Sequence, residues 1–453
     1  MGHIIQNFDA LACPESVEGT ENELRQDALA IAEAGYEAIN VGNALRRKLK
    51  IDGDELIVDM SSQDPAKSHL TETVRRHLAE RRVFFVGIGK CAFAAANEIE
   101  KLLGDKLAGG VALGVSDNEQ ADNVQHQVLH IVGTHPLPSE VNVQATERII
   151  QFLSERTEED LVIMLISGGG STLLCAPEAP MTFEYESVLF KTLTTHGATI
   201  QEMNTVRKHI SRARGGGLAR AAYPAEIVSL IVSDIPGNDI SFISSGPTVQ
   251  DTTTVADAEA ILSKYGITLQ AGTAFIESAK EEKYFERVTN ILFLTNRDAL
   301  FAMQSEATQR GYSTEIVNDH FTGEARDIGR AVVEKLHTTP TKTALLYAGE
   351  STVTIGASLG KGGRNQEMAL AVLETIGDGE IILPFSSDGR DNTDHAGAIG
   401  DKVSREHANT RGLLIQENLD AHSSYEFFST TGDALITGYT ESNVSDLIIA
   451  LKN

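Results

Sequence analysis

Residues 83–115, VFFVGIGKCAFAAANEIEKLLGDKLAGGVALGV, hold the pattern that decides the fold. A short apolar run ends in glycines, a segment with helical spacing follows, and a second apolar run closes the unit. Similar apolar runs begin at residues 128, 161, 226 and 291, with helical segments between them. Continuous apolar strands that alternate with helices are typical of a buried parallel sheet, so we predict an α/β fold.

The chain after about residue 340 has a different pattern. Residues 345–356, LLYAGESTVTIG, contain two β-like runs split by a glycine, which predicts a hairpin. Residues 443–453, NVSDLIIALKN, are expected to form a final amphipathic helix. We therefore predict two α/β domains. The larger, residues 1–335, is Rossmann-like with a mostly parallel sheet, and the smaller, residues 336–453, has a mixed sheet.

The composition is strongly acidic and excludes several classes of partner. The 453 residues include 38 Lys and Arg against 64 Asp and Glu, a net charge of −26. This excess of carboxylates argues against nucleic acid as a partner. No apolar run approaches the ~20 residues of a membrane helix, and the start has no secretory pattern. With three widely spaced cysteines, we expect a soluble cytoplasmic protein, either a monomer or a homodimer.

Glycine-rich segments follow several predicted strands, at the edge of an open α/β sheet where ligands bind. The first contains Gly87, Gly89 and Lys90 and opens a helix. An anion at that helix start would satisfy both the lysine and the free N–H groups, whereas the alternative is a solvated lysine. The second segment, a candidate concave phosphate site, consists of Ser167, Gly168, Gly169, Gly170 and Ser171.

A third glycine-containing turn, residues 233–239 (SDIPGND), carries carboxylates after a strand. Asp234 and Asp239 are hard oxygen ligands of the kind that suits Mg²⁺ held mostly by water and phosphate. Local hydrogen bonding within the turn is the alternative role for these aspartates. Asp234 is also a candidate base for a substrate hydroxyl.

A fourth segment, residues 362–367 (GGRNQE), opens another predicted helix with Gly363, Arg364 and Asn365. An arginine at such a place can clamp a carboxylate or a phosphate through two parallel hydrogen bonds. Asp388 and further aspartates lie downstream in what is either a site or a solvated loop.

Residues 204–214, NTVRKHISRAR, form a positive island in this acidic chain. Such an island can attract a small acidic substrate, and Asn204, Arg207 and Lys208 are its candidate binding residues. A helix surface that balances neighbouring carboxylates is the alternative. His209 competes with the aspartate of the third turn as the candidate base.

Eight blocks in order along the chain carry a family resemblance. They are GIGK, GTHPLPSE, LISGGGSTLL, MNTVRKHISRARGGGLA, SDIPGNDISFISSGPT, AGESTVTI, GGRNQE and TGYTESNVSDLIIAL. Together they resemble the type-II, MOFRL-containing glycerate 2-kinases from about residue 25 to the C-terminus. The resemblance implies an interdomain active-site cleft, and ATP- and Mg²⁺-dependent phosphorylation of D-glycerate to 2-phosphoglycerate. It further implies that Lys90 and Arg364 are the catalytic residues.

The chain departs from the family pattern in three places. Residues 387–398 read SDGRDNTDHAGA where relatives usually read SDGTDGPTDAAGA, and residues 437–444 read TGYTESNV in place of TGPTGTNV. The PGDD of relatives becomes PGND at residues 236–239, with one carboxylate fewer. These changes bear on substrate preference and on the metal ligands.

Two other functions are weighed against the kinase. An NAD(P)-dependent hydroxypyruvate or glycerate oxidoreductase is supported by Gly87-x-Gly89-x-x-Ala92 after a strand and by Asp117 after the next one. That interpretation leaves the SGGGS and GGRNQE segments unexplained. A non-catalytic binder of sugar acids or nucleotides would keep the pocket without the catalytic carboxylates.

Overall fold

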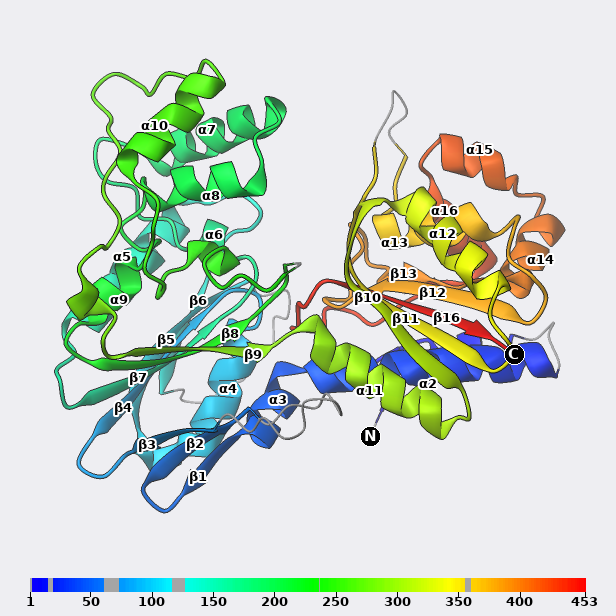
Figure 1. Ribbon diagram of the computed structural model, residues 1–453, viewed down its shortest axis with the longest axis horizontal. Helices are drawn as coiled ribbons and strands as arrows, with labels where there is room; N and C mark the ends of the chain where they lie inside the picture. The colour runs from blue at the N-terminus through cyan, green and yellow to red at the C-terminus, as the bar shows by residue number, and fades with distance from the viewer. Residues whose placement is uncertain (1, 15–18, 61–72, 116–126, 236, 355–359) are drawn as a thin grey trace.

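A six-stranded sheet organises the first body of the protein, seen here in a computed structural model (Figure 1). The structure describes residues 2–14, 19–60, 73–115, 127–235, 237–354 and 360–453. The strands are β4 (Arg82–Ile88), β5 (Leu107–Gly114), β6 (Val128–Val132), β7 (Asp160–Ile166), β8 (Glu226–Val232) and β9 (Val288–Leu294). Their order is β6-β5-β4-β7-β8-β9, and each neighbouring pair is parallel. The predicted parallel sheet is confirmed.

The strand order changes direction between β4 and β7. The chain moves outward from β4 through β5 to β6, then returns to β7 on the other side of β4. In open α/β sheets the ligand crevice lies beyond the carboxyl ends of the strands at such a point. The loops that follow β4 and β7, which carry Lys90 and Ser167, therefore meet at the place where this fold class binds ligands.

Helices cover both faces of this sheet because successive side chains of a strand point to opposite sides. Phe85 packs in the cluster that includes α4, whereas Phe84 and Val86 pack with α5 and α9. A small antiparallel sheet lies on the α4 side, and α6, α7, α8 and α10 stand above the sheet in Figure 1. The remaining elements are α3 (Val41–Lys48), β1 (Leu49–Asp52), β2 (Glu55–Asp59), β3 (Thr73–His77), α4 (Ala92–Leu103), α5 (Glu140–Ser154), α6 (Gly170–Leu173), α7 (Phe183–Thr195), α8 (Ile200–Lys208), α9 (Gly217–Ala222) and α10 (Val255–Lys264).

A mixed sheet organises the second body, as predicted. Its order is β10-β11-β16-β12-β13-β15, with β14 paired to β12. Only β10 and β11 run parallel; the other pairs are antiparallel. The strands are β10 (Ser313–Glu324), β11 (Thr343–Thr352), β12 (Glu380–Ser386), β13 (Gly397–Ala398), β14 (Gly400–Asp401), β15 (Ala434–Leu435) and β16 (Asp446–Lys452).

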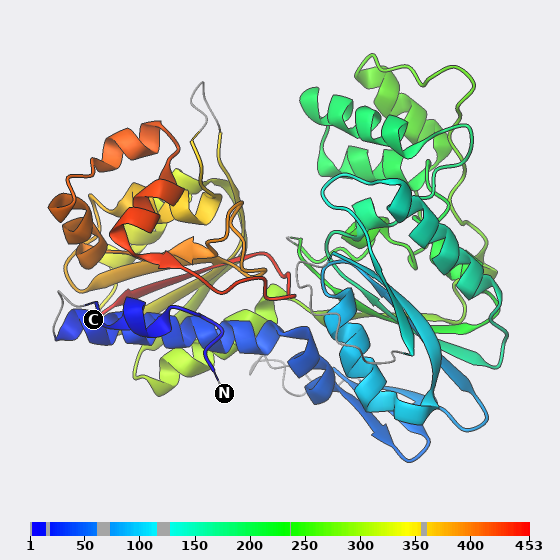
Figure 2. The same cartoon turned by 180° about the vertical axis from the view of Figure 1, so that it is seen from behind.

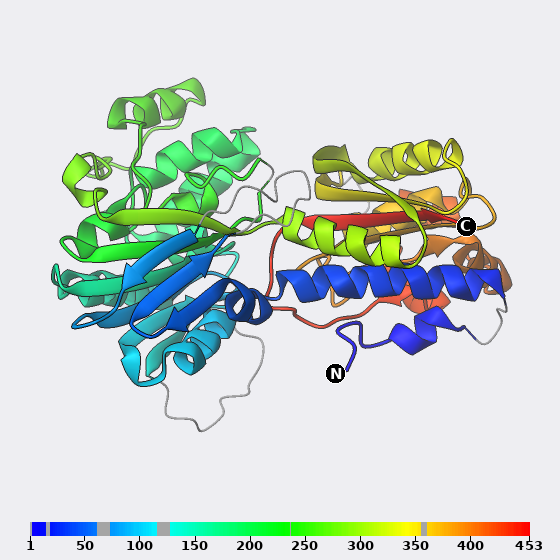
Figure 3. The ribbon, with the colours of Figure 1, turned by 60° about the horizontal axis from the view of Figure 1, so that its bottom comes forward.

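The second sheet is also covered on both faces. Leu345 and Ile448 pack against α12 and α13, while Leu346 and Ile449 pack in the cluster that includes α2 and α11. Figure 3 shows α2 and α11 side by side along the sheet. The helices of this body are α1 (Phe8–Ala12), α2 (Thr20–Ile39), α11 (Asn296–Gln309), α12 (Ala325–His337), α13 (Arg364–Val372), α14 (Lys402–Thr410), α15 (Ile415–Asp420) and α16 (Ser424–Thr431).

Two expected local structures are wrong. The final segment is strand β16 at the centre of the mixed sheet, not an amphipathic helix, because Leu447–Leu451 is buried on both faces. The predicted hairpin is one continuous strand, β11, in which Gly349 pairs with Phe321 on one side and Asp446 on the other. A Cβ atom on Gly349 would come within 2.3 Å of the Phe321 backbone, so the glycine allows close strand approach and makes no turn.

The chain crosses between the bodies twice. It passes from α2 in the second body to α3 in the first near residue 40, and returns between β9 and α11 (Figures 1 and 2). Arg25 of α2 forms buried ion pairs with Asp401 and Asp433 of the second body. The second body therefore contains the N-terminal helix and begins again at α11, ahead of the expected boundary at residues 335/336.

Among the described residues, no helix combines the length and the apolar character needed to cross a membrane.

Candidate functional site

A cavity of about 640 Å³ lies between the two bodies. Its wall combines residues that follow strands β4 to β8 of the first body with residues of the second body. The latter come from the end of β11, the start of α13, the end of β12 and the loop after it, and the loop that precedes β16. We call this cavity the cleft. Its lining comprises Lys90, Val115, His135, Pro136, Gly169, Asp234, Ile235, Glu350, Arg364, Ser386, Asp388, Arg390, Asp391, Asn392, Tyr439, Asn443 and Ser445.

Lys90 reaches into the cleft from the end of β4. Its Nζ atom lies 2.6 Å from Oδ2 of Asp388, so the lysine of one body is paired with a carboxylate of the other. The other oxygen of Asp388 accepts hydrogen bonds from Ser386 Oγ and from the Arg390 N–H. Burial and the nearby Lys90 charge lower the pKa of His135 on the facing loop. The cleft therefore contains a positioned cation and a neutral imidazole.

The glycines after β4 and β7 allow two loops to pack directly on one another. Gly89 has a φ of +106°, and a Cβ atom there would lie 2.3 Å from the Ser167 hydroxyl. The backbone N–H of Lys90 donates to Gly168 O at 2.9 Å, and that of Cys91 donates to Ser167 Oγ at 3.1 Å. The N–H groups of the two residues that precede α4 are thus bonded to protein.

The rest of the SGGGS segment is packed just as closely. A Cβ atom on Gly168 would lie 2.0 Å from the Asp234 carboxylate, and one on Gly170 would lie 2.1 Å from the Ser244 hydroxyl. Gly169 lines the cleft, and Ser171 lines a second cavity beside it. The three glycines therefore serve first to bring the loop against its neighbours.

Asp234 follows β8 and is a cleft carboxylate whose acidity is altered by its surroundings. Burial raises the pKa of Asp234 to about 6. The positive charge of Lys90 opposes this rise, and the negative charges of Glu350 and Asp388 add to it. Asn443 Nδ2 donates to its Oδ2 at 3.0 Å across the cleft. A carboxylate with this pKa is ionised at neutral pH and is well matched to accept a proton.

Arg364 enters the cleft from the second body at the start of α13. Its Nε atom lies 2.5 Å from Asp446, and its Nη1 atom lies 2.5 Å from Glu350. Burial raises the pKa of Asp446, and the guanidinium counteracts part of that rise. Arg364 is thus a cation of the cleft lining that two carboxylates of the second body hold in place.

The other residues of the GGRNQE segment do not line the cleft. The carboxylate of Asp391 accepts the backbone N–H groups of Asn365 at 3.1 Å and Gln366 at 2.8 Å, at the start of α13. A Cβ atom on Gly363 would come within 2.0 Å of Asp391. The anion position at this helix N-terminus is therefore filled by the protein's own aspartate.

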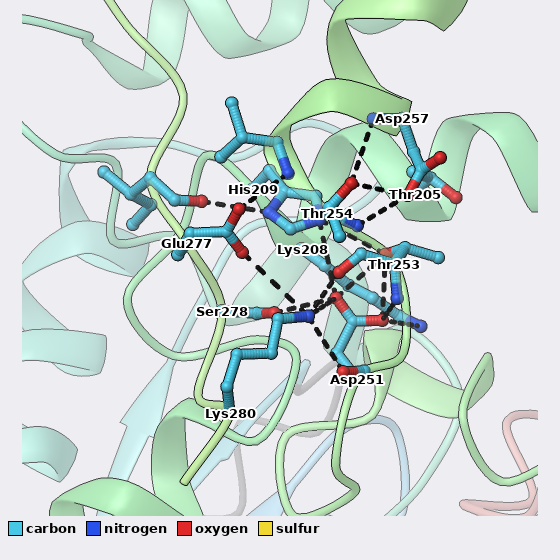
Figure 4. Close-up of polar contacts among 12 residues, drawn as sticks. Thr205, Lys208, His209, Asp251, Thr253, Thr254, Asp257, Glu277, Ser278 and Lys280 are labelled. Carbon is cyan, nitrogen blue, oxygen red and sulfur yellow. Dashed lines mark hydrogen bonds and ion pairs between the residues drawn. The ribbon is translucent and has the colours of Figure 1, made fainter.

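The positive island is divided among separate partners. Lys208 lies 3.2 Å from Asp251, and His209 hydrogen-bonds with the Ile276 carbonyl and with Thr253 (Figure 4). Burial favours a higher pKa for Asp251, but Lys208 and the hydrogen bonds outweigh it and lower the pKa. This network fixes the end of α8 away from the cleft lining, so His209 is not placed to act as the base.

The predicted site residues fall into three groups. Lys90, Gly169, Asp234 and Arg364 line the cleft, and Ser171 and Arg207 line the second cavity. The rest line neither cavity: Gly87, Gly89, Ser167, Gly168, Gly170, Asn204, Lys208, Asp239, Gly363 and Asn365. Buried Asn204 accepts from Ser245 Oγ, which in turn contacts Ser171 Oγ, so it supports the SGGGS loop from behind.

Several cleft residues were not singled out from the sequence. His135 lies in the GTHPLPSE block, and Tyr439 and Asn443 lie in the TGYTESNV block. Tyr439 Oη donates to the Lys90 carbonyl at 3.3 Å. The only available signal was that these polar residues stand in loops rich in glycine or proline, which does not identify a partner in the other body.

The expected metal pair does not come together. Asp239 is exposed, and its Oδ1 accepts the Ser241 N–H within its own turn, while Asp234 faces the cleft. Among the described residues, no three His, Cys, Asp or Glu side chains are grouped to hold a metal ion. Asp117 of the dinucleotide alternative lies outside the described residues.

Comparison with known proteins gives consistent matches over nearly the whole chain. A family described as a domain of unknown function, DUF4147, matches residues 27–277, and the MOFRL family matches residues 343–446. A putative hydroxypyruvate reductase of Agrobacterium vitis is 38% identical over 83% of this chain and 89% of its own. A glycerate 2-kinase of Pyrococcus horikoshii is 31% identical over 95% and 97%. The crystal structure of a Thermotoga maritima glycerate kinase, 30% identical, aligns with a TM-score of 0.79 over 95% of this chain and all of that one.

Proposed function

This chain belongs to the glycerate 2-kinase family that joins a DUF4147 domain to a MOFRL domain, and we propose that it transfers a phosphoryl group from ATP to the 2-hydroxyl of D-glycerate. The observation that carries this proposal is the convergence in one cleft of Lys90, Asp234 and Arg364, which come from both bodies. Phosphoryl transfer needs positioning and charge neutralisation more than covalent chemistry, and this site offers both.

Each of the three residues has a role that its surroundings allow. Asp234, with a pKa of about 6, takes the proton of the substrate hydroxyl. Lys90 and Arg364 stabilise the negative charge of the transferring phosphoryl group and of the substrate carboxylate. Both cations are paired with protein carboxylates in this structure. An anionic substrate therefore either displaces these carboxylates or shares the cations with them.

Magnesium enters this proposal with the nucleotide. The predicted pair of Asp234 and Asp239 does not fit as a protein-built site, since only Asp234 faces the cleft. Mg²⁺ usually retains several waters and binds through substrate phosphates, and it neutralises phosphate charge there. We therefore assign Asp234 to the proton and leave the metal to the phosphates of ATP.

The oxidoreductase alternative conflicts with the loop after β4. A dinucleotide pyrophosphate binds the N–H groups at the start of the first helix of such a fold. Here the N–H groups of Lys90 and Cys91, just before α4, are bonded to the SGGGS loop, and the space beside Gly89 is filled by Ser167. Because the Agrobacterium vitis relative is named a putative hydroxypyruvate reductase, the oxidoreductase activity is tested directly beside the kinase activity.

The test is turnover by the purified full chain with D-glycerate, ATP and Mg²⁺, followed by phosphorus NMR of the product. We expect 2-phosphoglycerate and ADP in equal amounts, and no product after the metal is chelated. L-Glycerate serves as the substrate control. Oxidation of NADH with hydroxypyruvate in the absence of ATP turnover would overturn the proposal, and so would the absence of both activities.

A further inference from the structure

A second cavity, of about 330 Å³, opens beside the cleft and is not used by the chemistry described above. It lies between the loop at Pro136–Pro138, the SGGGS loop, and helices α7 and α8. Pro136 lines both cavities, and Gly169 of the cleft is two residues from Ser171 of the second cavity. An extended ligand can therefore pass from one cavity to the other along the SGGGS loop.

The walls of the second cavity are apolar and partly open to solvent. Leu137 is 65% exposed and Val188 is 59% exposed, and both line the cavity. Pro138 and Phe190 complete the apolar lining. Small-molecule sites are usually concave, largely apolar and at least about 300 Å³ in volume, with a few polar groups that fix orientation. This cavity meets that description at the small end of the range.

The cavity also carries a cation without a carboxylate partner. In the run 204–214, Lys208 pairs with Asp251, Arg212 with Glu147, and Arg214 with Glu186. Across the described part of the chain, Arg207 has no ion pair, and its guanidinium lies 4.7 Å from the centre of the Phe190 ring. Figure 4 shows how Lys208, the adjacent cation, is turned into the Asp251 network.

The local charge balance is positive in a chain of net charge −26. Arg207 and Arg214 lie close enough to repel each other, with Glu186 as the nearby carboxylate. Burial and then Arg214 lower the pKa of Arg207 to about 10, which leaves it charged at neutral pH. Within the described structure, Nε and Nη1 of Arg214 are buried without a hydrogen-bond partner. Lys191, at the rim, adds a further positive charge.

We propose that the second cavity binds the nucleoside part of a nucleoside polyphosphate, with the base against the apolar lining that includes Leu137 and Val188 and with Arg207 and Lys191 directed to its phosphates. This deepens the proposed kinase function, because the phosphate chain then leads past the SGGGS loop into the cleft. Apolar walls suit the flat faces of a base, and guanidinium groups suit phosphates.

The test measures ADP binding to the full chain by calorimetry in two variants. Arg207→Met removes the unpaired cation, and Val188→Asp places a carboxylate at the exposed wall. We expect each to weaken ADP binding at least about tenfold, which is the effect of losing or opposing one charge-assisted contact. The KM for ATP should rise by a similar factor, while the KM for D-glycerate should change less than about twofold.

Matched controls come from α5, where Arg148→Met and Val141→Asp make the same changes at exposed positions outside both cavities. These variants should bind ADP like the unmodified chain. Unchanged ADP binding in both cavity variants would overturn the inference, as would a selective loss of D-glycerate binding. If the unmodified chain binds ADP at this cavity but does not phosphorylate D-glycerate, the kinase proposal fails and the nucleoside site stands.

Discussion

Replacing Asp234 by Asn should make the protein more stable and less active at the same time. The pKa of Asp234 is about 6, against an ordinary value of 3.8, mainly because the carboxylate is buried. Ionised Asp234 is therefore less favourable in the folded chain than in the unfolded one. A rise of about two pH units corresponds to a cost of about 3 kcal/mol, and water in the cleft makes this an upper limit.

The sign of the pH dependence follows from the raised pKa. Below pH 3.8 the carboxyl is protonated in both states and costs nothing; the cost develops between pH 3.8 and 6 and is complete above pH 6. Asn removes the charge and still offers a carbonyl to Asn443. The gain in unfolding free energy should therefore approach its full size at pH 8 and almost vanish at pH 4.

Urea unfolding of Asp234→Asn and of the unmodified chain at both pH values measures this difference. Asp239→Asn, which removes a charge from the same turn at an exposed position, is the matched stability control. Loss of the proton acceptor should lower kcat by about 10²–10⁴. Equal stability at pH 8, or a gain that does not depend on pH, would refute the assignment of a strained ionised carboxylate at this position.

Two further predictions concern the cations. Lys90→Ala and Arg364→Ala should each lower kcat by about 10²–10³. Steady-state kinetics on the folded variants should show the double variant little worse than the poorer single one. Normal turnover in Lys90→Ala would remove it from the chemistry. Lys208→Met should instead lower the unfolding free energy by about 3 kcal/mol, because it leaves buried Asp251 without its closest lysine. The KM for D-glycerate, measured on the folded variant, should stay unchanged. A changed KM at full stability would contradict the structural role of that lysine.

The parallel sheet could be predicted from the sequence because its strands are mainly apolar runs and helical segments separate most of them. Strand β16 could not, since the short apolar run within its seven residues fits a buried strand and a buried helix equally well. Its place between β11 and β12 depends on pairing with residues some sixty to one hundred positions away. Local periodicity carries no such information.

The candidate site was predictable at the strand ends and not across the cleft. Lys90, Asp234 and Arg364 each follow or begin a recognisable element, so their positions on sheet edges or helix starts could be inferred. The pairing of Lys90 with Asp388 depends on how the two bodies meet. The glycines of the SGGGS loop illustrate the same limit. Their spacing resembles a phosphate-binding loop, whereas a glycine is needed at position 168 because a Cβ atom there would collide with the Asp234 carboxylate.

The double crossing of the chain has a consequence for biosynthesis. Helix α2 leaves the ribosome long before the sheet that it covers, because that sheet is complete only once β16 has been translated. Arg25 likewise waits for Asp401 and Asp433 before its charge is paired. The first body, whose sheet is complete by residue 294, can fold while the rest is still being made. The apolar face of α2 cannot be fully covered until β16 has emerged, which makes this amphipathic helix a segment of the nascent chain that benefits from chaperone protection.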